Sequence, residues 1–455
     1  MRKMPAFVLS ALLAAGLGIV PAGASAAPGG EAPLTLSECL DLAFRNSPEL
    51  ASADQRLSAS RAGLLGAYGG FLPNVSTSLG YSHNYIGPKP GSLQYNSITQ
   101  EFFVLDIASR DYESYDFGIS ANLTLFAGFA RWAALKSQKL GLAASEADRV
   151  TTRHQVENAV ILAYYDLVRA QMMVELSQSS LDANREQYEQ ACRAFSMGAV
   201  ARSDTLRASV RYAEARLALL EADNSAALAR VALATLIGRD AAEPLSAEAV
   251  DSPQSFAPID RRQAIGAALD THPTLKAAAF RYEASQQEIR QAKAGLWPAL
   301  GASYRYGWGD LDPPDDPLQV FDQDYSYTLG VGLQWDLFDG FRTKQSIKQA
   351  RANSRIQEYN LELQRRSIVQ GVEATLVTLE NARQRIELAR ATVDLATEDL
   401  RLARERYRVG AATLLEVTEA EVSLVQGRAT EIEGITNYLS ALAELERATG
   451  LDLSP

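Results

Sequence analysis

The sequence predicts a mixed α and β fold in which β-hairpins are joined to very long coiled-coil helices, with the whole unit present twice. Three observations predict it. Blocks of sequence recur at fixed offsets, two proline-free windows have the composition of helical rods, and matched segments before each rod alternate between apolar and small polar residues. Together they indicate a duplicated chain rather than a compact globule.

The duplication is visible as two constant offsets. Residues 46–50 recur at 271–275 and residues 71–75 at 296–300, both 225 positions later, whereas residues 125–129 recur at 337–341, 212 positions later. The first copy therefore has a 13-residue insertion relative to the second. We expect a first repeat at 36–240, a linker at 241–260 and a second repeat at 261–452, and each repeat should start with a helix that precedes its hairpin strands. Two copies of this size make a duplicated domain and not a solenoid.

The N-terminal residues 1–26 have the pattern of a secretory signal peptide. Arg2 and Lys3 supply the positive start, residues 7–20 the apolar segment, and 24–26 (Ala-Ser-Ala) the small-residue cleavage site. The protein is therefore expected to be exported.

Composition argues against several classes of function. A net charge of −11 argues against nucleic acid as a partner, because binding it needs a basic patch. The three histidines, His83, His154 and His272, are scattered, and no zinc spacing, phosphate loop or nucleophile elbow occurs. Cys39 and Cys192 are not the pattern of a disulfide framework, and the sequence leaves open whether they are free or bridged to each other. We expect no enzyme, no catalytic residue, no cofactor and no metal site.

Long helices fill the proline-free windows. We expect helices at 130–196 and 199–237 in the first repeat, and at 342–408 and 411–449 in the second. A helix of 67 residues would be about 100 Å long, a length that indicates a coiled coil or a helical barrel. Gly198 and Gly410 interrupt the two rods, so each repeat should form an antiparallel helix pair with a glycine at its tip.

Two hairpins precede the rods, with strands at about 74–83 and 114–126 and at about 299–308 and 325–338, and polar loops at about 83–113 and 309–324. One face of these strands is apolar and the other is Gly, Ser and Thr. Such long amphipathic strands fit a membrane barrel better than the alternative, a soluble sandwich. The residues expected to face lipid are Tyr115, Phe117, Ile119, Leu123, Tyr327, Leu329, Val331 and Leu333.

Four strands per chain cannot close a barrel, and open strand edges are not tolerated in lipid. Closure therefore needs other subunits. Two copies would give eight strands, whose interior side chains fill, whereas three would give twelve and leave a hydrated lumen. The sequence thus predicts a trimeric β-barrel of 12 strands continued by a long α-helical barrel, and such an assembly is a conduit.

At this point the chain resembles the TolC-like outer membrane factors, the exit ducts of efflux pumps and type I secretion systems. The resemblance covers 36–453 and includes the residues at 46–50 and 71–75, the Leu-Phe-x-Gly-Phe segments and both glycine tips. It implies a homotrimer in the outer membrane of a Gram-negative bacterium, in contact with outer membrane lipid. It also implies a helical tunnel through the periplasm, a periplasmic adaptor (membrane fusion) protein and an inner-membrane transporter as partners, and no nucleic acid.

The resemblance also implies roles for residues at the helical tips. The residues expected to contact the adaptor are Gly198, Ala199, Val200, Arg202, Gly410, Ala411, Ala412 and Thr413. Asp204, Glu416 and Glu419 are expected to line the periplasmic entrance, where rings of carboxylates would attract cations. The sequence departs from better-known relatives in having Glu instead of Asp at the second tip, and Ala412 where some relatives have a basic residue.

Two other interpretations remain at this stage. A periplasmic coiled-coil adaptor or scaffold without a membrane span would explain the helices and export, but not the four alternating strands at matched places. An outer-membrane enzyme would need a catalytic constellation at the barrel rim, and His83 alone does not supply one.

Overall fold

The computed structural model describes residues 33–250, 252–254, 256, 258–314, 316 and 318–451, so the expected signal peptide at 1–26 lies outside the described residues. The first repeat consists of α1 (Leu36–Asn46), α2 (Pro48–Gly69), β1 (Asn74–Ile86), β2 (Lys89–Asn96), β3 (Glu101–Ile107), β4 (Arg110–Ala127), α3 (Ala130–Ser196) and α4 (Arg202–Ile237). The second consists of α5 (Arg261–Thr271), α6 (Pro273–Lys293), η1 (Ala294–Leu296), β5 (Ala299–Asp310), η2 (Gln319–Phe321), β6 (Tyr325–Gln334), α7 (Arg342–Arg408) and α8 (Leu414–Thr449).

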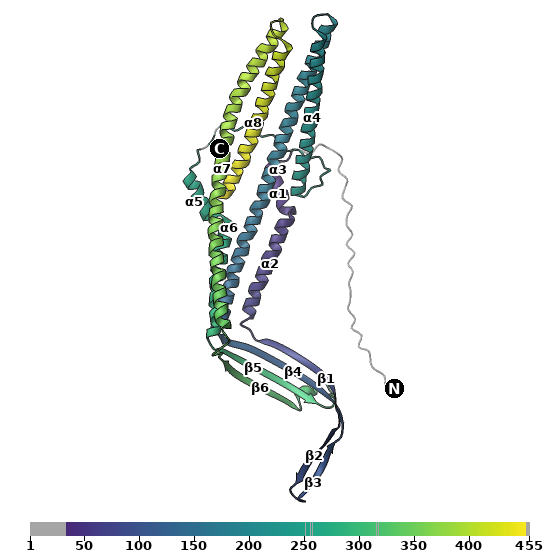
Figure 1. Cartoon of the computed structure of the whole chain (residues 1–455), viewed down its shortest axis with the longest axis vertical. Coiled ribbons are helices and arrows are strands. Elements are labelled where there is room, and N and C mark those ends of the chain that lie inside the picture. Colours follow the sequence, from purple (N-terminus) through teal and green to yellow (C-terminus); the bar gives the residue numbers. More distant parts are fainter. Residues whose placement is uncertain are drawn as a thin grey trace, which may run out of the picture.

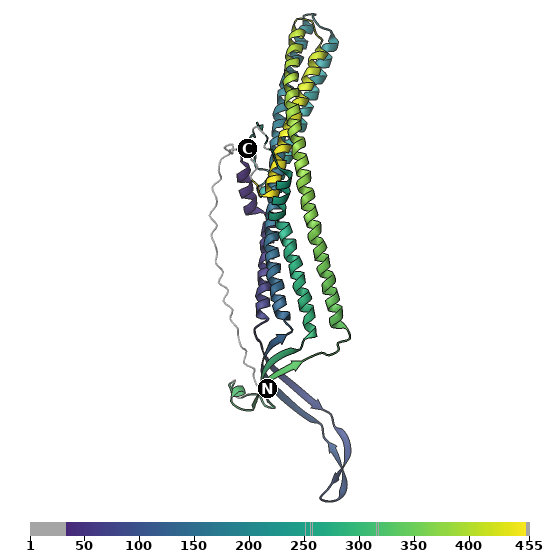
Figure 2. The same ribbon diagram turned by 90° about the vertical axis from the view of Figure 1, so that its left-hand side faces the viewer.

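The molecule is elongated, with a bundle of helices at one end and a curved sheet at the other (Figure 1). The pairs α3–α4 and α7–α8 reach the end of the bundle farthest from the sheet, and the small ribbon β2–β3 projects from the opposite end of the molecule (Figures 1 and 2). Among the described residues, no helix combines the length and the apolar character that a membrane crossing would require.

Heptad spacing explains why the rods pair. On α7 the buried residues Val372, Leu379 and Ile386 lie seven apart, and so do Thr375, Ala382, Ala389, Ala396 and Ala403. These two series are the a and d positions of a coiled coil, and they pack against α8. Each repeat has its own core at mid-length: α1 packs with α3 and α4 around Val160, Leu167 and Leu233, and α5 packs with α7 and α8 around Ile386 and Leu445.

The sheet is antiparallel with the strand order β1-β4-β5-β6, so hairpins of both repeats join in one sheet. In the central pair, Phe117 lies opposite Trp308 and Ile119 opposite Tyr306. Because side chains alternate across a strand, this register places apolar residues of all four strands on one face. The other face has Gly, Ser, Thr and Asn, with Ser76 and Ser120 joined by a 2.8 Å hydrogen bond.

The two segments predicted as loops contain regular secondary structure, so the prediction was wrong in these segments. Strand β1 extends to Ile86, β4 starts at Arg110, and the segment between them forms the paired strands β2 and β3. Leu93 lies opposite Val104 and Tyr95 opposite Phe102, so this ribbon has an apolar side that the polar composition of the segment hides. In the second repeat, β5 continues to Asp310 and η2 interrupts the expected loop.

Several element boundaries also differ from those expected. Strand β6 ends at Gln334, four residues early, and α4 and α8 begin three residues late, at Arg202 and Leu414. The helix before each hairpin is broken in two at Ser47 and His272, because each precedes a proline that disfavours the α conformation. Cys39 and Cys192 are both free, and burial raises the pKa of the Cys39 thiol to about 11.

The sequence indicated that the three histidines are scattered, but two of them, His154 and His272, lie together where the repeats meet. Arg447 Nη1 donates a 3.3 Å hydrogen bond to the His154 carbonyl, and Arg447 also lowers the pKa of His272. Burial is the largest cause of the lowered pKa values of His154, His272 and Arg447. His272 Nδ1 and Arg447 Nε are buried without a hydrogen-bond partner in the described structure. Two histidines with lowered pKa values therefore lie beside the half-buried guanidinium of Arg447.

This cluster predicts acid sensitivity at the junction. The folded pKa of His272 is below its ordinary value of 6.5, so stability should be lost as pH falls below that value, because the unfolded chain takes up the proton first. The variant His272→Ser copies Ser47 of the first repeat, whose hydroxyl caps α2. The melting temperature of His272→Ser should fall less than that of the wild type between pH 7.5 and pH 5. Parallel curves would show that His272 is not the source.

Candidate functional site

The amphipathic sheet is the first candidate functional surface. The structure places all eight residues expected to face lipid on its apolar face. Leu79, Leu329, Val331 and Leu333 on this face have between 67% and 85% of their surface exposed. A soluble protein rarely leaves so continuous an apolar area in water.

The two helical tips are the second candidate surface, and they have the same backbone geometry. Gly198 and Gly410 have φ values of +73° and +77°, a region that residues with a Cβ rarely adopt. The amide of Gly198 donates to the Phe195 carbonyl, and that of Ala199 to the Ala194 carbonyl, at 2.9 Å each. Gly410 and Ala411 repeat these bonds at the second tip. This is a Schellman turn, which reverses each helix pair within a few residues.

The second tip has a side-chain cap that the first tip lacks. The Thr413 hydroxyl accepts a hydrogen bond from the Glu416 amide, and the Glu416 carboxylate accepts one from the Thr413 amide at 3.0 Å. Arg406 of α7 forms a 3.3 Å ion pair with Glu416 and also donates to the Ala411 carbonyl. At the first tip, Ala201 occupies the capping position and offers no side-chain bond. Hydrogen bonds from Thr413 are the largest cause of the lowered pKa of Glu416.

The three acids expected at the entrance thus have different surroundings. The Glu416 carboxylate accepts a hydrogen bond from the Thr413 amide and pairs with Arg406, so it caps α8 and also carries a charge. Asp204 is close enough to Tyr407 of α7 to contribute, after burial, to the raised pKa of that tyrosine. Glu419 is exposed. Ala199, Arg202, Ala411 and Thr413 are exposed at the tips, whereas Val200 and Ala412 are half-buried.

A buried carboxylate joins the two helix pairs just behind the tips. Glu421 of α8 is only 6% exposed. Its two carboxylate oxygens accept hydrogen bonds from the side-chain amides of Asn184, at 3.2 Å, and Gln187, at 2.7 Å, both on α3. Burial raises the pKa of Glu421, although the bond from Gln187 opposes this. These bonds are direct polar links between the first and second repeats.

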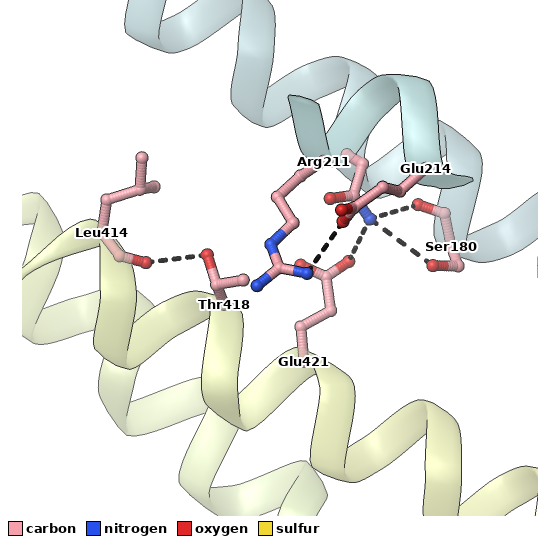
Figure 3. A network of polar contacts seen from close by, with 7 residues as sticks. Ser180, Arg211, Glu214, Leu414, Thr418 and Glu421 are labelled. Carbon is pink, nitrogen blue, oxygen red and sulfur yellow. Dashed lines mark hydrogen bonds and ion pairs between the residues drawn. The ribbon is translucent and has the colours of Figure 1, made fainter. Parts of the chain in front are cut away.

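The Glu421 network borders a groove between α4 and α8. Figure 3 shows Arg211 and Glu214 of α4 across from Thr418 and Glu421 of α8. Arg211 and Glu214 form a 2.8 Å ion pair within α4. The apolar lining comes from Leu206 and Val210 on one side and Leu414 and Leu415 on the other. The groove is therefore an apolar depression with charged edges, located at the tips.

Sequence reasoning missed both Glu421 and the cap, although each had a signal. Thr413-x-x-Glu416 is the pattern of a capping box. Glu421 lies on the helix face marked by Val417, Ala420 and Leu424, and the first repeat has Ser209 in its place. A charged residue within an apolar stripe indicates a partner on another element, but the sequence does not say which. Within the described part of the chain, no group of His, Cys, Asp or Glu side chains could hold a metal ion.

Comparison with known proteins gives consistent matches over the whole folded region. The family described as "Outer membrane efflux protein" matches residues 39–239 and 264–451. Protein CyaE of Bordetella pertussis is 27% identical, covering 91% of this chain and 85% of its own length. The pyoverdine export outer membrane protein OpmQ of Pseudomonas putida is 28% identical, with the same coverage of 91% and 85%. The solved structure of the outer membrane protein VceC from Vibrio cholerae has a TM-score of 0.77 at 20% identity, covering 92% of this chain and 97% of its own, and so has the same fold.

The Glu421 link predicts a specific pH dependence. The folded pKa of Glu421 is above the ordinary value of 4.5, so its ionisation costs stability as pH rises from that value to the raised one. Glu421→Gln mimics the protonated acid and does not titrate. The melting temperature of Glu421→Gln, measured by circular dichroism and relative to wild type, should increase from pH 4.5 to pH 7. A constant difference would argue against a buried carboxylate.

Glu421→Ala is the companion variant. It leaves the amides of Asn184 and Gln187 without their acceptor, which should cost about 1–3 kcal/mol at any pH in this range. Ser209→Ala, at the equivalent position of the first repeat, is the matched control, and it should leave the melting temperature nearly unchanged.

Proposed function

The chain belongs to the outer membrane efflux protein family and is an outer-membrane exit duct, and we propose how it assembles. Three copies of the chain form one pore through the outer membrane and the periplasm. The family is one of export ducts and not of enzymes. The amphipathic sheet also supports the duct over a periplasmic adaptor without a membrane span, because such an adaptor would have no role for the sheet. We propose that the transport partners are a periplasmic adaptor protein and an inner-membrane transporter.

The observation that carries the proposal is a sheet that is amphipathic and open at both edges. Its outermost strands, β1 and β6, have free edges within the described chain. Consecutive strands are antiparallel, so β1 and β6 run in opposite directions, and β6 of one copy can pair antiparallel with β1 of the next. Three copies of this four-stranded sheet would then give a barrel of twelve strands with an open lumen. The apolar face would contact lipid and the Gly/Ser/Thr/Asn face would line the pore.

The helices support the same assembly. Leu388, Leu395 and Leu402 on α7, and Val409 at its C-terminal end, lie seven apart, outside the packed heptad positions, and are 44–75% exposed. On α4, Leu206, Val210, Leu217 and Leu220 form a second exposed stripe, with 54–58% of each residue exposed. Seven-residue spacing of exposed apolar residues is typical of a helix that packs against another helix. We propose that these stripes meet the helices of neighbouring copies and close the tube.

The tips would then form the periplasmic entrance. A ring of three copies brings together three sets of Asp204, Glu416 and Glu419, and such a ring attracts cations and repels anions. The Schellman turns present Gly198, Ala199, Val200 and Arg202 at one tip and Gly410, Ala411, Ala412 and Thr413 at the other. We propose that these turns are where the adaptor binds, and that opening separates the helix pairs that Glu421 links.

The barrel proposal is tested by placing the same charge on opposite faces of one strand. Leu329→Arg puts a cation toward lipid, which costs about 2–4 kcal/mol near the bilayer midplane. Thr328→Arg, one residue away, puts it into the pore. Leu329→Arg should reduce the yield of outer-membrane trimer, and Thr328→Arg should assemble but pass less cation current in planar bilayers. Equal assembly of both variants would contradict the assigned faces.

The entrance proposal is tested by removing charge without disturbing the cap. Glu419→Gln leaves the Thr413–Glu416 bonds intact, so any change reports on the carboxylate ring. We expect a lower cation preference in planar bilayers, and a larger loss when Asp204→Asn is added. Glu221→Gln, at an exposed position farther along α4, is the control and should match wild type. Unchanged ion selectivity in the double variant would rule out an entrance lined by these acids.

A further inference from the structure

The segment that joins β5 to β6 folds back over the apolar face of the sheet. Tyr306 Oη donates a 2.6 Å hydrogen bond to the Val320 carbonyl in η2. The Phe321 ring packs edge-on against Phe117, with centroids 5.5 Å apart, and stacks on Tyr306 at 5.7 Å. Phe117 and Tyr306 belong to the apolar face, so the segment lies on that face and not over the pore.

This packing covers one end of the apolar face. Trp308 is 4% exposed and Val320 is 7% exposed. On the same face, toward the middle of β6, Leu329 is 75% exposed. The covered end is the one farthest from the helices, where β5 ends at Asp310 and β6 begins at Tyr325. The segment therefore covers the apolar face at the end where the strands would leave the membrane on the external side.

The outer side of the segment is amphipathic. Leu318 is 70% exposed and Phe321 is 51% exposed. Asp322 follows directly and Asp324 two residues later, and both are exposed as well. Asp316 accepts a 2.9 Å hydrogen bond from the Leu318 amide. Exposed apolar residues flanked by charges, beside an aromatic cluster that includes Tyr306, Trp308 and Tyr325, are typical of a protein surface at the level of lipid headgroups.

We propose that residues 318–321 form a membrane-interface anchor, with Leu318 and Phe321 inserted at the headgroup and acyl boundary of the outer leaflet. The inference rests on the proposed barrel, because it needs the apolar face to contact lipid. Lipid is the expected partner because Leu318 and Phe321 continue the apolar face of the sheet outward. The acids that follow stay in the aqueous layer. The first repeat has no equivalent segment, since its strands continue into the β2–β3 ribbon.

Spin-label accessibility tests the anchor. Cys39→Ala and Cys192→Ser remove the native thiols, and single cysteines then replace Leu318, Leu329 or Glu101 in the full chain. The labelled trimers are reconstituted into vesicles of phosphatidylethanolamine and phosphatidylglycerol. Collisions with oxygen report lipid, and collisions with a water-soluble nickel chelate report water. We expect position 318 to be several-fold less accessible to nickel than position 101 on the ribbon. We also expect position 318 to lie at a shallower depth in the bilayer than position 329.

The three labels separate the possible failures. If position 329 is in lipid and position 318 is as accessible to nickel as position 101, the segment is a solvated loop and the anchor is wrong. If position 318 is protected from both oxygen and nickel, protein covers it, and the lipid assignment is overturned. If position 329 is itself in water, the barrel face proposed above fails, and the anchor fails with it.

Discussion

The unpaired backbone groups along β1 and β6 are the constraint on which the rest of this structure depends. Hydrocarbon offers no hydrogen bonds, so a sheet placed in a bilayer must pair every edge. A sheet with the order β1-β4-β5-β6 does not do this alone, because its first and last strands are not paired with each other. In the proposed trimer, further copies would satisfy the edges, and the helices attached to each strand would then be arranged in a ring as well. A requirement of the sheet would thus organise a helical tube.

The duplication supplies that tube with two similar but unequal walls. Each repeat has its own core at mid-length and the same glycine turn at its tip. The differences lie at specific positions. The second tip is capped by Thr413 and Glu416, whereas the first has Ala201, and Glu421 replaces Ser209 where the repeats are linked. Two walls with the same architecture can therefore differ in how firmly their ends are held.

Local patterns allowed much of this to be predicted, and long-range contacts account for what was missed. Alternation fixes which face of β4 and β6 is apolar, and Gly198 and Gly410 mark the turns, because both signals are contained within a few residues. The bond from Gln187 to Glu421 joins residues 234 positions apart, and no local pattern identifies such a partner. The contact of Phe321 with Tyr306 is similar: an aspartate-rich segment has the composition of a loop, and only the fold brings its aromatic ring onto the sheet.

The equal lengths of the rods limit how this molecule can evolve. Helices α3 and α7 both have 67 residues, and α4 and α8 both have 36. Each residue adds about 1.5 Å of rise, so an insertion in one rod alone would offset its tip from the neighbouring one. Any insertion other than whole heptads would also shift its heptads out of register. Length changes in the rods should therefore be inherited in matched pairs. The 13-residue difference between the repeats lies instead in the region of the β2–β3 ribbon, at the end of the molecule where length is not shared.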